Sequence, residues 1–93
     1  MAVYIGILLV KVIRANDLVA GDVDGLSDPY VSLKLAGQKV KTKVVDDSLN
    51  PTWNETLHLC VERLDEPLIL RVLDEDLVGR DFLGSATIPC AFQ

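Results

Sequence analysis

The stretch that decides the fold is VSLKLAGQKVKTKV, residues 31–44. Every second residue of 31–35 is apolar, and over 40–44 valine or threonine alternates with lysine. A period of two predicts strands that bury one face on a core. The three residues Ala36-Gly37-Gln38 between the two runs have hairpin length and include a glycine. The stretch therefore predicts a β-hairpin.

The same period of two recurs along the chain. It is present at residues 8–12, 57–61 and 68–72, a shorter apolar run covers 83–88, and residues 46–51 form a predicted turn. No stretch has a convincing helical stripe. Many short strands at regular spacing indicate an all-β antiparallel sandwich.

Length and composition limit the function classes. The 93 residues suffice for one small domain, and 9 basic against 14 acidic residues give a net charge of −5, which argues against nucleic-acid binding. Cys60 and Cys90 are too few for a disulfide framework. A single disulfide is one alternative, and reduced thiols in an intracellular protein are the favoured one. The apolar run 3–10 is too short for a membrane span and has no signal-peptide flanks.

Aspartates are concentrated in the two longest predicted loops, residues 16–29 and 75–82. The first loop holds Asp17, Asp22, Asp24 and Asp28, and the second holds Asp76 and Asp81 after Asp74 at a strand end. If the loops meet at one end of the sandwich, several carboxylates converge and need a counter-charge. Such oxygen ligands suit Ca²⁺, and the single histidine and two cysteines form no zinc site. The alternative is that acidic loops only aid solubility.

Three motifs resemble those of the C2 domain family, a Ca²⁺-dependent phospholipid-binding module. They are LVAGDVDGLSDPYV at 18–31, LNPTWNE at 49–55 and DEDLVGRDFLG at 74–84. The short third loop is similar to that of extended synaptotagmins or multiple-C2-and-transmembrane-domain proteins. This resemblance covers nearly the whole chain and implies a C2-like antiparallel Greek-key β-sandwich of eight strands. Since the sequence stops about where the seventh strand would end, we expect a single domain over 1–93, truncated at one or both ends and lacking about one strand.

The resemblance also implies the site. It assigns Ca²⁺ binding to five carboxylates and two backbone carbonyls, namely Asp22, Asp28, Asp74, Asp76 and Asp81 with Gly21 and Glu75. It implies Ca²⁺-dependent docking on anionic phospholipid membranes, at the cytoplasmic side, and is compatible with a membrane-anchored parent protein. We expect no catalysis, because no nucleophile or catalytic histidine accompanies the carboxylates.

Further residues are expected to contact lipid. Leu77, Val78 and Arg80 lie mid-loop, where aliphatic groups can insert into the interface and arginine can pair with phosphate. A lysine patch of phosphoinositide-binding character is formed by Lys34, Lys39, Lys41 and Lys43. The alternative is a solvated lysine face that prevents strand aggregation.

Two other readings remain open. The chain is alternatively a protein-interaction module with weak or no lipid binding. In addition, a missing edge strand would leave a sheet edge unpaired, with Leu9, Ile13, Ile69 and Leu73 pointing outward. We therefore expect self-association, most simply as a two-fold homodimer.

Overall fold

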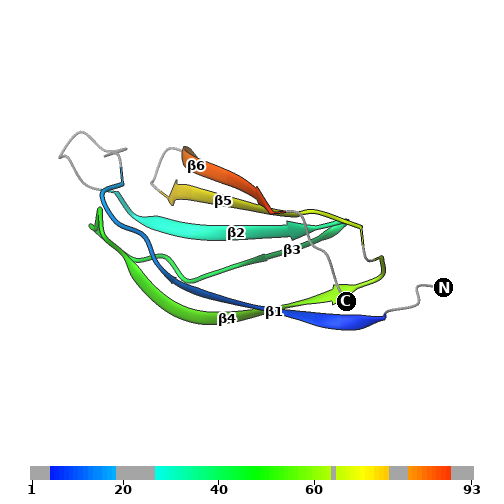
Figure 1. Ribbon diagram of the computed structural model, residues 1–93. Helices are drawn as coiled ribbons and strands as arrows, with labels where there is room; N and C mark the ends of the chain where they lie inside the picture. Colours follow the sequence, from blue (N-terminus) through cyan, green and yellow to red (C-terminus); the bar gives the residue numbers. More distant parts are fainter. Residues whose placement is uncertain (1–4, 19–26, 64, 76–79, 89–93) are drawn as a thin grey trace.

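Two antiparallel β-sheets stack on one another (Figure 1). The computed structural model describes residues 5–18, 27–63, 65–75 and 80–88. Within them the strands are β1 (Gly6–Arg14), β2 (Pro29–Leu35), β3 (Gln38–Lys41), β4 (Thr52–Val61), β5 (Leu68–Glu75) and β6 (Arg80–Ile88). The sheets have the orders β1-β4 and β3-β2-β5-β6. The prediction of an all-β antiparallel sandwich is confirmed. None of the described residues forms a helix that is long and apolar enough to cross a bilayer.

The predicted hairpin is the β2–β3 pair. Leu33 lies opposite Val40, and Leu35 already pairs with Gln38, so the connection has two residues rather than three. Ala36, in this turn, takes a positive φ of 53°. β3 ends at Lys41, earlier than the alternation predicted, because the hydroxyl of Thr42 accepts the N–H of Val31 and the N–H of Lys43 donates to Glu55 of β4.

The core lies between the two sheets. Side chains that alternate along the strands meet there, with Leu33 and Leu59 at 0% and 1% exposure. Trp53 closes the core near one end, where its ring N–H donates to the carbonyl of Pro29 at 3.3 Å. Each fully buried leucine contributes about 1.5–3 kcal/mol, so this alternation accounts for the stacking.

The turn at residues 48–51 holds the segment that follows β1. The backbone N–H groups of Ala15 and Leu18 donate to the carbonyls of Pro51 and Leu49, at 3.0 and 2.9 Å. The Asn50 side chain accepts from the N–H of Asp17. The second predicted motif therefore fixes the start of the first acidic loop.

The outward face of β1 is largely apolar, with Lys11 as its charged residue. Ile7, Leu9 and Ile13 on this face, and Ile5 just before the strand, are 52–67% exposed. Two of the four residues expected to point outward, Leu9 and Ile13, do so. Ile69 is half-buried, and Leu73 is buried, which corrects the expectation for it. Tyr30, which lies opposite Leu73 in the sheet, is also buried.

Candidate metal centre

Asp74 is a buried carboxylate at the end of the sandwich from which the second acidic loop starts. It lies near the end of β5 and pairs with Pro29 at the start of β2, so the sheet itself fixes its position. Its side chain is fully buried. One oxygen, Oδ1, accepts the N–H of Asp28 at 2.8 Å. The other, Oδ2, is buried with no hydrogen-bond partner in the described part of the chain.

Asp28 is held from three sides. Its N–H donates to Asp74, and its carbonyl accepts the N–H of Glu75 at 3.0 Å. Its side-chain Oδ1 accepts the N–H of Asp47 at 2.7 Å. The sequence predicted a turn at Asp47 but no contact with the acidic loops. The turn is anchored by a further bond, from the N–H of Ser48 to the carbonyl of Ser27.

Asp81, a third acidic residue of the predicted site, lies beside Asp74 because their strands pair. β6 pairs with β5 in a register that sets Asp81 opposite Asp74 and Arg80 opposite Glu75. The sheet thus brings Asp28, Asp74 and the backbone of Asp81 to one end of the molecule. The remaining predicted loop residues lie outside the described residues: Gly21, Asp22, Asp76, Leu77 and Val78.

The chemistry of these described residues fits a hard cation. Among the residues that the structure describes, no three potential metal-ligating side chains form a complete group. The backbone N–H of Asp28 nevertheless donates to the Asp74 carboxylate, and the other oxygen of that carboxylate is buried without a donor. A buried polar group without a partner costs about 1–3 kcal/mol, and more when it is charged. An oxygen-seeking cation such as Ca²⁺ would remove that cost.

Lysines meet on the outer surface of the β2–β3 hairpin. Lys34 lies directly opposite Lys39, and Lys41 lies opposite Ser32. The ammonium of Lys41 sits 5.7 Å from the ring centroid of Tyr30, within range of a cation–π attraction. A shallow hollow of about 270 Å³ is lined by Tyr30, Lys39, Val40 and Lys41.

Lys43 differs from the other predicted lysines. It lies beyond the end of β3, and its backbone N–H donates to a carboxylate oxygen of Glu55 at 2.8 Å. Since Glu55 belongs to β4, this segment turns toward the other sheet. The structure therefore brings three of the four predicted lysines together on β2 and β3.

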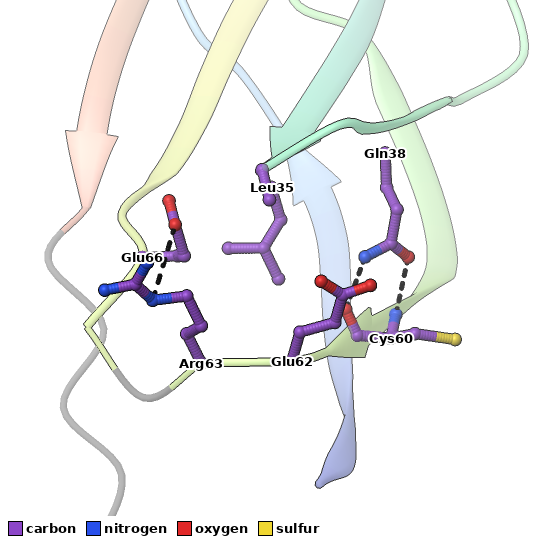
Figure 2. A pocket seen from close by; sticks show the side chains of 7 residues that line it. Leu35, Gln38, Cys60, Glu62, Arg63 and Glu66 are labelled. Atoms are coloured by element: carbon purple, nitrogen blue, oxygen red, sulfur yellow. Dashed lines mark hydrogen bonds and ion pairs between the residues drawn. The ribbon is translucent and has the colours of Figure 1, made fainter. Parts of the chain in front are cut away.

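A second hollow, at the other end of the sandwich, is too small for a ligand. Figure 2 shows Gln38 facing Cys60, with its carboxamide bonded to both the N–H and the carbonyl of Cys60. Arg63 pairs with Asp65 at 3.2 Å and lies 3.9 Å from Glu66. These two acids, Asp65 first, raise the pKa of Arg63. The enclosed space of about 20 Å³ has room for little more than one water molecule. The thiol of Cys60 is free.

Comparisons with known proteins agree with this geometry. Over 82 residues the chain is 48% identical to Synaptotagmin-5 of Arabidopsis thaliana, covering 85% of this chain and 15% of that protein. Over 85 residues it is 44% identical to Extended synaptotagmin-1 of Rattus norvegicus, covering 84% of this chain and 8% of that protein. The chain therefore spans only a small part of these relatives.

Solved structures show the same fold. The C2A domain of plant Extended Synaptotagmin 1 superposes with a TM-score of 0.85 at 34% identity, over 92% of this chain and 70% of that one. The calcium-bound C2A and C2B domains of Extended-Synaptotagmin 2 give a TM-score of 0.83 at 34% identity, over 96% of this chain and 36% of that one. The C2 domain model matches residues 6–92. The chain belongs to the C2 domain family.

Proposed function

We propose that this domain docks on anionic phospholipid membranes when it binds Ca²⁺, and that it has no catalytic activity of its own. The observation that carries the proposal is the fully buried Asp74, whose Oδ2 has no donor among the described residues and whose Oδ1 is bonded to Asp28. A calcium-bound structural neighbour at 34% identity supports it.

The proposed ligands come from both acidic loops. They are the carboxylates of Asp22, Asp28, Asp74, Asp76 and Asp81 and the carbonyls of Gly21 and Glu75. The backbone bonds between Asp28 and residues 74–75 support a common site. When bound, the ion supplies positive charge and open coordination positions for lipid oxygens.

The charge balance supports a calcium-dependent switch. The five aspartates equal the net charge of −5, so the rest of the chain is neutral. Two Ca²⁺ ions would cancel four of these five charges. The loop end would then stop repelling an anionic leaflet, and binding would weaken with added salt.

Other parts of the chain would add membrane contacts. In this proposal Leu77 and Val78 insert at the interface and Arg80 pairs with phosphate, while the lysine patch binds phosphoinositides. The domain would lie peripherally at the cytoplasmic face of a membrane. A relative from Mus musculus is named Multiple C2 and transmembrane domain-containing protein 2. The transmembrane domain in that name supports a membrane-anchored parent protein.

Vesicle co-sedimentation tests the proposal. Pelleting should require both Ca²⁺ and phosphatidylserine, and Asp74→Asn should abolish the calcium-dependent part. Asp65→Asn is the matched control, because Asp65 is exposed and lies in the turn between β4 and β5, at the opposite end of the sandwich (Figure 1). Pelleting that is equal in Ca²⁺ and in EGTA would refute the proposal and favour a protein-interaction module.

Self-association is a second candidate function, favoured by β1. Within the described residues β1 pairs only with β4, and its outward face carries exposed Ile7 and Leu9. A nine-residue strand with a free edge and an apolar face can pair with a second copy. Light scattering should show a dimer that Leu9→Lys dissociates and Thr56→Lys, on β4, does not. A monomer at high micromolar concentration would refute this candidate.

A further inference from the structure

Residues 45–51, which we call the clamp segment, are bonded to both ends of the first acidic loop. At the start of that loop two backbone N–H groups, those of Ala15 and Leu18, donate to carbonyls of the clamp segment. At the end of the loop, residues 27–29 are joined to it by three further hydrogen bonds. The clamp segment therefore holds both ends of the loop, although it includes none of the predicted calcium ligands.

One of these hydrogen bonds involves a side chain that is a predicted calcium ligand. The backbone N–H of Asp47 donates to Oδ1 of Asp28 at 2.7 Å. The hydrogen bonds on either side of it, at 2.7 and 3.0 Å, join backbone atoms only. The bond from Asp47 therefore fixes the orientation of the Asp28 carboxylate and leaves its second oxygen for a cation.

An independent observation indicates a cation beside Asp28. Asp74 accepts the N–H of Asp28 through Oδ1, and its fully buried Oδ2 has no partner among the described residues. Carboxylates that bind a metal are themselves held by hydrogen bonds from groups that do not touch the metal, and loss of such a bond lowers metal affinity about 10–100-fold. The N–H of Asp47 is in the right place to be such a group.

The backbone of Asp47 has a conformation that few residue types tolerate. Its φ is 53°, in the left-handed region. Glycine, asparagine and aspartate adopt this region readily, whereas β-branched residues do not. The turn that points the Asp47 N–H at Asp28 depends on this conformation. The residue type at position 47 therefore controls whether the hydrogen bond can form.

We propose that Asp47 is a positioning residue for calcium binding, and that its left-handed backbone, rather than its carboxylate, orients Asp28. This inference rests on the proposed calcium-dependent function and adds to it a residue outside both acidic loops. Asp47 is exposed, and in the described part of the chain it belongs to no group of three potential metal-ligating side chains. The charge of Asp47 is thus dispensable, while its conformation is not.

Calorimetric titration with Ca²⁺ at physiological salt tests the inference. Asp47→Val should weaken binding about ten-fold, because the N–H no longer points at Asp28. Asp47→Asn and Asp47→Gly tolerate the left-handed conformation and keep the N–H. They should bind within about three-fold of the wild type, since salt screens an exposed charge.

Ala36→Val is the matched control. Ala36 is also exposed and left-handed, with a φ of 53°, but it lies in the β2–β3 turn, at the other end of β2 from Asp28. The same β-branched residue at this position should lower the melting temperature in EGTA and leave the Ca²⁺ affinity unchanged. The control therefore separates a loss of stability from a loss of positioning.

Amide hydrogen exchange in EGTA tests the hydrogen bond without calcium. The Asp47 amide should exchange about ten-fold faster in Asp28→Ala than in the wild type, since a bond to a charged group is lost. The Ser48 amide donates to the carbonyl of Ser27 and should exchange as before.

Four results would overturn the inference. Equal weakening by Asp47→Asn and Asp47→Val would assign the effect to the carboxylate, and equal weakening by Ala36→Val would assign it to stability. The other two are unchanged Ca²⁺ binding in Asp47→Val and unchanged exchange of the Asp47 amide in Asp28→Ala. A wild type that does not bind Ca²⁺ would refute the proposed function as well, whereas any of the four results beside a wild type that binds Ca²⁺ would refute this inference alone.

Discussion

Replacing Asp74 with asparagine should stabilise the calcium-free protein while removing its response to calcium. Asp74 is fully buried, and its Oδ2 has no hydrogen-bond partner among the described residues. The substitution preserves shape and retains an oxygen that can accept the N–H of Asp28. It removes a buried negative charge, so the native state is relieved of a desolvation cost that the unfolded chain does not have.

The expected change in the free energy of unfolding follows from the burial of Asp74. A buried polar atom without a partner costs about 1–3 kcal/mol, and asparagine still leaves one amide group to satisfy. The gain should therefore be near the lower limit, about 1 kcal/mol. In a domain of this size each kcal/mol shifts the melting temperature by about 4–8 °C. The variant in EGTA should melt higher than the wild type by that amount.

Thermal unfolding in EGTA and in Ca²⁺ is the assay. At a calcium concentration a hundred times the Kd, binding stabilises the wild type by about 2.7 kcal/mol, which raises its melting temperature by roughly 10–20 °C. Asp74→Asn should show little of this rise, whereas Asp65→Asn should respond like the wild type. A variant that melts well below the wild type in EGTA would refute the reasoning, since Asp74 would then be a structural residue.

Two further predictions concern the fold. Leu33→Ala should lower the free energy of unfolding by about 2–5 kcal/mol in urea denaturation, because Leu33 is fully buried, whereas Leu9→Ala, at an exposed site, should have little effect; equal effects would contradict the assigned core. Gln38→Ala should cost about 1–3 kcal/mol, because it leaves the N–H and carbonyl of Cys60 without the carboxamide that binds both; an unchanged denaturation midpoint would show that water replaces Gln38 fully.

The sequence predicted the layers of this fold because its strands alternate. The hairpin at 31–44 and the strands near 57–61 and 68–72 are all present in the structure. The predicted positions of the strand ends were less accurate. The run to Val44 stops at Lys41, since the hydroxyl of Thr42 accepts the N–H of Val31 and the next residue turns toward β4. Hydrogen bonds of this kind, in which side chains take part, cannot be predicted from the alternation of apolar and polar residues.

The sequence predicted residues of the candidate site but not the hydrogen bonds that hold them in place. Family spacing singled out Asp28 and Asp74, and the structure joins them by a hydrogen bond. The role of Asp47 was missed, because a turn signal says nothing about which loop it touches.

The hydrogen bonds around Asp28 fix the ends of the two acidic loops, whatever the lengths of the loops. Asp28 and Glu75 are tied through the backbone where each loop joins its strand, and Asp74 is set by the sheet. Residues inserted into the sequence at 19–26 or 76–79 would leave these hydrogen bonds unchanged. Loop extension is well tolerated in energy when the stems are fixed, because the closure cost rises only slowly with length. This end of the domain is therefore a suitable scaffold for loop grafting, in which new tips are exchanged while the carboxylates at their base stay in place.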